Sequence, residues 1–224
     1  MITLALNEKY FLKDPQHTDL GTKIVSSSIQ LIDELGFEQF TFKKLAKEIH
    51  STEASIYRYF ENKHKLLMYL IAWYWKWMEY LIDYRINNIE EAERKLDIAL
   101  KTLCEEVNFD PNFVNIDEIA LRRIVVSESN KTYLTKHVDE DNKEGLFRGY
   151  KSLCRLIANL VKEYNPDFMY PHALISTVIE ASHQQAFFAQ HLPSLTEVQR
   201  DDPDMYNKIF VFLQHLVMSA INRA

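Results

Sequence analysis

The residues best suited to chemistry lie close together between positions 41 and 63. Hydroxyl, carboxylate and cationic side chains recur there at short spacing, and such groups can hold phosphate oxygens or meet the edges of bases. Between Lys43 and Lys65, six basic residues stand against three acidic ones, a local surplus of positive charge in a chain of net charge -6. The negative total argues against a protein that coats nucleic acid indiscriminately. The candidate contacts are Thr41, Lys43, Thr52, Glu53, Ala54, Ser55, Tyr57, Arg58, Tyr59 and Lys63.

Two short helices are expected to position these residues. Thr41 is a suitable N-cap for a helix that ends near His50, and a second helix is expected from residue 53 to 60. At about 100° per residue, the second helix turns Ile56 and Phe60 inward. Its outward positions are then those of Ala54, Ser55 and Arg58, flanked by Tyr57 and Tyr59.

Longer helices flank this pair. A first helix is expected from residue 20 to 35, with Gly36 taking the left-handed conformation that ends it. Asn62 is a suitable cap for a fourth helix that runs to about Ile86 and is dense in tryptophan and tyrosine. Two short helices joined by a tight turn and preceded by a supporting helix match the helix-turn-helix arrangement, whose second helix enters the DNA major groove.

The rest of the chain is expected to be helical as well, giving an all-α protein of about nine helices. The sequence has only 4 glycines and 6 prolines, and strand-like alternation is hard to find. An acidic segment at residues 136 to 143 is expected to be a loop after one helical turn. Connections are expected at Asp110-Pro111, Asn165-Pro166 and Leu192-Pro193, between helices near 90–107, 115–129, 143–164, 171–191 and 204–222.

Four stretches of the N-terminal region form a recognisable pattern. They are Thr41-Phe-Lys-Lys-Leu-Ala-Lys-Glu-Ile49, Ser55-Ile-Tyr-Arg-Tyr-Phe60, Asn62-Lys63 and Leu66-Leu67. Within residues 20 to 68, this pattern resembles the N-terminal signature of TetR-family regulators. The resemblance implies an N-terminal arm and three-helix helix-turn-helix DNA-binding domain over residues 1–64. It also implies a larger helical ligand-binding and dimerisation domain over residues 65–224.

The resemblance further implies a division of roles among the candidate contacts. Arg58 can donate two hydrogen bonds to guanine, and Glu53 can accept one from cytosine. Core packing is the competing interpretation for the aromatic residues, and a solvated helix face is the competing interpretation for the lysines at 43, 44 and 47. The implied phosphate contacts are Thr41, Tyr57, Tyr59 and Lys63, and the implied base-facing residues are Ala54, Ser55 and Arg58.

The turn between the two short helices departs from the pattern of the family. His50 stands where a turn glycine is usual, and Ser51 stands where a small apolar residue is common. Histidine tolerates a left-handed backbone better than most side chains do. We therefore expect His50 to take the conformation that the glycine would have.

Aromatic and polar residues downstream indicate a cavity for a small molecule, because such side chains line most ligand pockets. Core packing competes with this interpretation for the aromatic residues, and solvent exposure competes with it for the polar ones. No metal, cofactor or catalytic group is expected, since the sequence lacks metal-ligand spacing, a CxxC pair and a nucleophile with a paired base. The candidate ligand residues are Trp77, Tyr80, Arg122, His183 and Phe187.

The last two long helices carry more apolar residues than one shallow core needs. In the family, two such helices from each subunit form a dimer interface, while burial within the monomer is the competing account.

Neither a signal peptide nor a membrane span is expected, which favours the cytoplasm. The sequence predicts a homodimeric repressor that leaves a near-palindromic DNA operator when a small molecule binds. The alternative is a helical small-molecule-binding protein, or an enzyme acting on an apolar substrate, that does not bind DNA.

Overall fold

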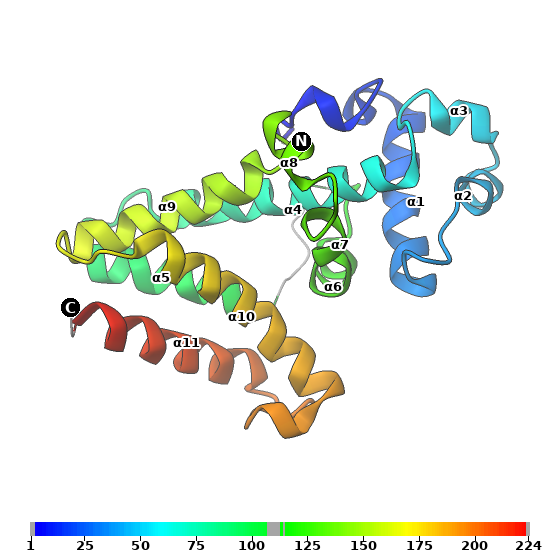
Figure 1. Ribbon diagram of the computed structural model, residues 1–224. Coiled ribbons are helices and arrows are strands. Elements are labelled where there is room, and N and C mark those ends of the chain that lie inside the picture. Colours follow the sequence, from blue (N-terminus) through cyan, green and yellow to red (C-terminus); the bar gives the residue numbers. More distant parts are fainter. Residues whose placement is uncertain (1–2, 107–112, 114, 223–224) are drawn as a thin grey trace. The chain divides into compact units, whose positions relative to one another are not determined.

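The computed structural model describes residues 3–106, 113 and 115–222, and over these residues it is all-helical, as predicted (Figure 1). The N-terminal helices are α1 (Asp19–Leu35), α2 (Phe42–Glu48), α3 (Glu53–Tyr57) and α4 (Lys63–Ile86). They are followed by α5 (Ala92–Cys104), α6 (Glu118–Glu128), α7 (Asn130–Tyr133), α8 (Val138–Lys143), α9 (Arg148–Tyr164), α10 (Pro171–His191) and α11 (Met205–Asn222). Short 3-10 helices are η1 (Glu8–Tyr10), η2 (Pro15–His17) and η4 (Pro193–Leu195).

The expected end of α1 and the expected caps of α2 and α4 are confirmed. Gly36 has a φ of 76° and ends α1, which a residue with a Cβ atom would do only under strain. The Thr41 hydroxyl accepts a hydrogen bond from the Lys44 N–H at 3.2 Å and caps α2. The Asn62 side chain accepts the Lys65 N–H at 2.9 Å and caps α4. Local sequence signals therefore determine where this part of the chain becomes helical.

Helix α3 is shorter than the predicted span of residues 53 to 60. After Tyr57 the chain tightens, and the N–H groups of Tyr59 and Phe60 both donate to the Ile56 carbonyl, at 2.8 and 3.1 Å. Ile56 and Phe60 are nevertheless fully buried. The predicted inward face is confirmed, although its last turn is not α-helical.

The prediction of a loop after one helical turn for the acidic segment at residues 136 to 143 is wrong. The segment contains α8. This helix closes where the Leu146 N–H donates to the Asp141 carbonyl at 3.0 Å. α7 is a further short helix, and α9 starts at Arg148 rather than at residue 143. α7 and α8 lack the apolar periodicity by which a helix is recognised in a sequence. The connection predicted at Asp110-Pro111 lies outside the described residues.

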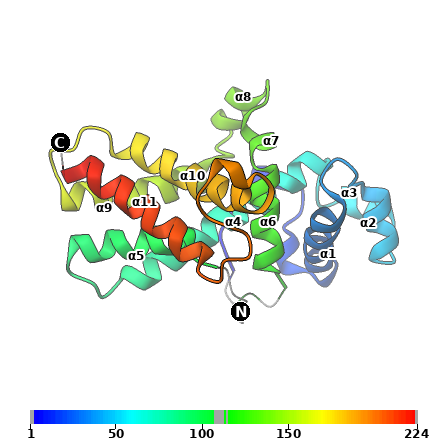
Figure 2. The same cartoon turned by 90° about the horizontal axis from the view of Figure 1, so that it is seen from below.

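The chain forms two compact units, and α4 contributes to both. Unit 1 comprises the described residues of 1–76 and 107–149, and unit 2 those of 77–106 and 150–224. In unit 1, α1 packs against α2, α6 and η2, and α2 packs against α3. In unit 2, α11 packs against α10 and α5, which lie beside it in both views (Figures 1 and 2). The functional boundary predicted after residue 64 stays a prediction.

The N-terminal arm, residues 3–18, is tied to the helices of unit 1. The Leu12 N–H donates to the Tyr59 carbonyl at 2.7 Å, next to the end of α3. The Asn7 side chain donates to the Glu144 carbonyl at 2.8 Å, just after α8. The arm therefore links the end of α3 to the end of α8.

Candidate nucleic-acid interface

The turn between α2 and α3 is built around His50. This residue has a φ of 53°, so the left-handed conformation expected from the sequence is confirmed. The His50 N–H donates to the Lys47 carbonyl at 3.2 Å, and the Ser51 N–H donates to the Ala46 carbonyl at 2.8 Å. These two bonds form a Schellman motif, which satisfies carbonyls that the end of a helix leaves without partners. The turn thereby fixes the direction in which the chain enters α3.

The start of α3 is fixed in the same way, by a side chain. The Thr52 hydroxyl accepts the Ser55 N–H at 3.2 Å, so one of the unpaired donors of the first turn is satisfied. A helix of five residues has few hydrogen bonds of its own, and its cap is correspondingly important. The cap and the turn together orient α3 relative to α2.

An apolar platform, formed by Phe42, Leu45, Ile56 and Phe60, lies beneath α3, and all four side chains are buried. The Tyr57 ring meets the edge of Phe42 with centroids 5.0 Å apart and an interplanar angle of 71°. Tyr57 is nevertheless 49% exposed. The platform therefore holds this ring in place while the side chain stays accessible to a partner.

The opposite face of α2 and α3 is polar and accessible. It offers hydroxyl donors, cations and one carboxylate within a few residues, the groups that hold phosphates and read base edges. In Figures 1 and 2, α2 and α3 lie at the edge of unit 1, away from α6–α8. Among the predicted contacts, Thr41, Lys43, Thr52, Glu53, Ala54, Tyr57 and Arg58 are exposed, and Ser55 is half-buried.

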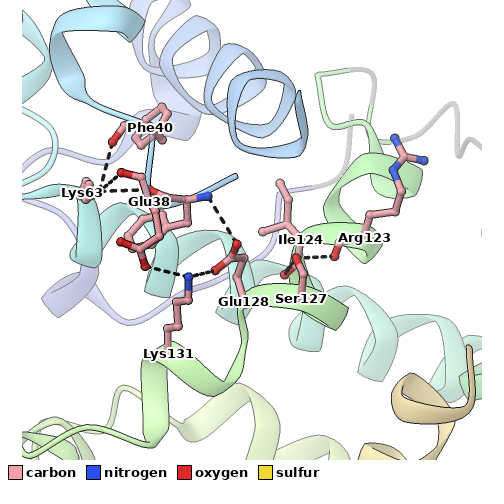
Figure 3. Close-up of polar contacts among 9 residues, drawn as sticks. Glu38, Phe40, Lys63, Arg123, Ile124, Ser127, Glu128 and Lys131 are labelled. Carbon is pink, nitrogen blue, oxygen red and sulfur yellow. Dashed lines mark hydrogen bonds and ion pairs between the residues drawn. The ribbon is translucent and has the colours of Figure 1, made fainter. Parts of the chain in front are cut away.

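Tyr59 and Lys63 differ from the other predicted contacts. Tyr59 is only 4% exposed, and its hydroxyl shares a 2.7 Å hydrogen bond with the hydroxyl of Thr18, the N-cap of α1. Lys63 is half-buried, and its ammonium donates to backbone carbonyls between α1 and α2 (Figure 3). Both side chains therefore already have polar partners within the protein.

Lys13 of the arm is a nearby cation that the sequence did not identify. Its ammonium lies 5.2 Å from the centre of the Tyr59 ring, and the residue is exposed. It stands 46 residues before Tyr59, and no motif connects the two positions. The exposed Lys44 and Lys47, for which a solvated helix face is the competing interpretation, extend the same surface on α2.

Acidic residues of α8 and its end reduce the positive charge next to this surface. Lys65 lies 3.4 Å from a Glu144 carboxylate oxygen and 3.9 Å from one of Asp141. Burial lowers the pKa of His64 below its usual value, although Asp141 opposes that shift, and the lowered pKa favours the neutral form of the side chain. The local surplus counted along the sequence is therefore partly compensated in space.

The predicted ligand residues fall in both units. Arg122 lies on α6 in unit 1 and is buried. In unit 2, Trp77 and Tyr80 both lie on α4. Trp77 is buried, and the Tyr80 ring stacks on that of Tyr84 with centroids 6.3 Å apart. On α10, His183 is buried, and the Phe187 ring lies 4.6 Å from that of His191. Their role in binding a ligand stays a prediction.

Within residues 3–106, 113 and 115–222, no three His, Cys, Asp or Glu side chains gather as a metal site. No helix among these residues is both long and apolar enough to cross a bilayer.

Residues 24–70 match the family model of "Bacterial regulatory proteins, tetR family". The matched segment covers most of α1, all of α2 and α3, and the beginning of α4. It therefore contains the Schellman turn, the platform and the exposed polar face. The curated proteins contain no significant match to this chain.

Several solved structures have a fold similar to that of this chain. The chain is similar to the fatty acid degradation regulator FadR from Bacillus halodurans, with a TM-score of 0.58 and 17% identity over 88% of this chain and 96% of that one. For FadR from Bacillus subtilis, in complex with stearoyl-CoA, the TM-score is 0.62 and the identity is 15%, over 88% of this chain and 97% of that one. For AibR, in complex with isovaleryl coenzyme A and operator DNA, the TM-score is 0.58 and the identity is 13%, over 86% of this chain and 95% of that one. At these identities the likeness establishes the fold.

The left-handed turn predicts the effect of restoring a glycine. His50→Gly removes the steric cost of a Cβ atom at positive φ, and we expect it to raise the free energy of unfolding by about 1 kcal/mol. Urea unfolding monitored by circular dichroism measures the change. His50→Ala keeps the Cβ atom and is expected to show no such gain. A glycine variant less stable than the wild type would contradict this account of the turn.

Proposed function

We propose, on the premise that residues 24–70 match the family model of the tetR regulators, that the chain is a ligand-responsive, DNA-binding transcriptional regulator of that family. It binds a near-palindromic operator as a homodimer, represses transcription in the cytoplasm and leaves the DNA when a small molecule binds. The observation that carries this proposal is the exposed polar face of α3, supported from beneath by buried aromatic and aliphatic side chains. The chain is assigned no catalytic step.

The exposed residues supply the DNA contacts in this proposal. Arg58 donates two hydrogen bonds to a guanine, and Glu53 accepts one from a cytosine in the major groove. Ala54 and Ser55 lie against neighbouring base edges, and the hydroxyls of Thr41 and Tyr57 hold phosphates. Lys43 and Thr52 flank these groups at the same surface. Their exposure, which is partial for Ser55, supports these roles.

Dimerisation is proposed through α10 and α11. On α11, Ile209, Leu213 and Val217 are buried inside unit 2, but Phe212 is 50% exposed and the neighbouring Val211 and Leu216 are exposed too. Covering such a face with a second copy removes apolar surface from water. A symmetric dimer then presents two α3 helices for half-sites about 34 to 36 Å apart.

A small molecule is proposed to control DNA binding through the helices downstream of α3. Two solved regulators of similar fold hold stearoyl-CoA and isovaleryl coenzyme A. A ligand changes DNA affinity only to the extent that it prefers one of two conformations, here the one with mismatched half-site spacing. The residues proposed to meet the ligand are Trp77, Tyr80, Arg122, His183 and Phe187.

Fluorescence anisotropy with labelled DNA from upstream of the protein's own gene tests the proposed function. Affinity is expected to fall steeply as salt rises, because each neutralised phosphate releases counterions. A chain that binds a small apolar molecule but shows no preference for this DNA would support the alternative of a binding protein or enzyme.

Replacement of Arg58 tests the assignment of base contacts. Arg58→Ala is expected to reduce discrimination at one base pair of each half-site by roughly 1 to 3 kcal/mol, because the bidentate donor is lost. Competition titrations with operators substituted at single positions measure this change. Arg155→Ala, an exposed arginine on α9, serves as the control and is expected to leave discrimination unchanged. Equal discrimination by wild type and Arg58→Ala would refute the assignment.

Replacement of Phe212 tests the dimer interface. Phe212→Asp places a charge on the apolar face of α11, and we expect monomers in light scattering together with a loss of operator affinity of roughly two orders of magnitude. Met169→Asp changes another highly exposed apolar side chain and is expected to leave the dimer intact. A Phe212→Asp variant that remains dimeric would remove this face from the interface.

A further inference from the structure

Residues 36–40 connect α1 to α2 and form a corner. Three carbonyl groups of this corner point at one side chain. Lys63, the first residue of α4, donates to the carbonyls of Phe37, Glu38 and Phe40 at 3.0, 3.2 and 3.2 Å (Figure 3). Its ammonium also lies 4.7 Å from the centre of the Phe37 ring. A lysine ammonium has three donors. The corner therefore matches the full donor capacity of Lys63.

A second lysine reaches the corner from α7. Lys131 lies 2.8 Å from a carboxylate oxygen of Glu38 and 2.8 Å from one of Glu128, and Figure 3 places it between the two. Glu128 is 8% exposed, and its other oxygen accepts the Phe37 N–H at 3.4 Å. The hydrogen bond to Glu128, and then that to Glu38, raises the pKa of Lys131, so its ammonium stays charged at neutral pH. The backbone of Phe37 is thus held from two sides.

The corner leads directly into α2. Thr41, the residue after the corner, is the N-cap of α2, and the turn at His50 connects α2 to α3. On the other side, Arg123 of α6 donates two hydrogen bonds to the Asp33 carboxylate of α1, at 2.8 and 2.6 Å. α6 is therefore fixed to α1, and the adjoining α7 can hold the corner in place.

We propose that Lys63 and Lys131 are positioning residues for DNA binding, which together fix the corner and hence the direction in which α2 and α3 face the duplex. The inference rests on the proposed function. It reassigns Lys63 from a phosphate contact to an internal support, because carbonyl groups engage its donors. It also makes α6 and α7 determinants of DNA affinity, although neither helix belongs to the helix-turn-helix.

The salt dependence of operator binding distinguishes a positioning role of Lys63 from a phosphate contact. Each phosphate contact contributes about 0.9 to the slope of log affinity against log salt. We expect Lys63→Gln to bind the operator about tenfold more weakly with the wild-type slope, because the lost hydrogen bonds are internal. Lys43→Gln is the matched control and is expected to lower the slope. A slope lowered by about 0.9 in Lys63→Gln would overturn the reassignment.

Variants of Lys131 test the contribution of α7. Lys131→Gln is expected to weaken operator binding about fivefold, and Lys131→Arg to restore it, because arginine can bridge the same carboxylates. Lys136→Gln removes an equal charge from an exposed neighbouring position and is expected to change affinity little. Equal effects of Lys131→Gln and Lys136→Gln would reduce the role of Lys131 to its charge and overturn the inference.

Replacement of Glu38 distinguishes the positioning role from a purely electrostatic effect, because the two predict opposite changes in DNA affinity. Glu38→Ala removes a negative charge near the DNA-binding face, so long-range electrostatics alone would strengthen binding. Release of Lys131 from the corner would weaken binding, which is the result we expect. Glu34→Ala, an exposed position on α1, is the matched control and is expected to strengthen binding slightly. Tighter binding by Glu38→Ala would overturn the inference.

Two further observations keep these results interpretable. Thermal unfolding of each variant establishes that it is folded at the titration temperature, and Lys63→Arg is expected to retain operator binding because it keeps a donor at the corner. If the wild type binds the operator and the three variants Lys63→Gln, Lys131→Gln and Glu38→Ala bind it with the same affinity, the positioning role is overturned. The proposed function then still stands. A wild-type chain that binds no upstream DNA would overturn both.

Discussion

Helix α3 is too short to maintain its own shape, and the proposed DNA-binding surface depends on what fixes it. Isolated helices of fewer than about 12 residues are marginal in water, and α3 has five. Its geometry therefore comes from the burial of Ile56 and Phe60, from the Thr52 cap and from the left-handed turn at His50. These constraints all act on the inner side and the ends of the helix. The outer side, with Tyr57 and Arg58, is left for a partner.

The cap and the turn are local constraints, and local constraints can be predicted from a sequence. A glycine after an apolar helix, a threonine before another and a histidine in a short turn each act within four residues of their own position. The ends of α1 and the cap of α2 were predicted for this reason. The same reasoning failed for α7 and α8, because their stabilising contacts come from other segments and leave no apolar period in their own residues.

Interactions between distant segments were beyond prediction. Glu128 accepts a hydrogen bond from a residue 91 positions earlier, and the carbonyls that engage Lys63 precede it by 23 to 26 positions. A lysine at the start of a helix looks the same in sequence whether it faces a phosphate or a carbonyl. The grouping of α6–α8 with the N-terminal helices has the same origin. The surface of α3 is consequently supported by residues far outside the matched segment.

Duplex DNA is proposed to dock on the outer side of α2 and α3. Hydrogen exchange of the full chain, measured by mass spectrometry with and without DNA from upstream of its gene, tests this most directly. We expect the slowing of exchange that accompanies direct contact to be strongest in peptides covering residues 41 to 63. Bound DNA that leaves exchange in these peptides unchanged while protecting another part of the chain would contradict the account.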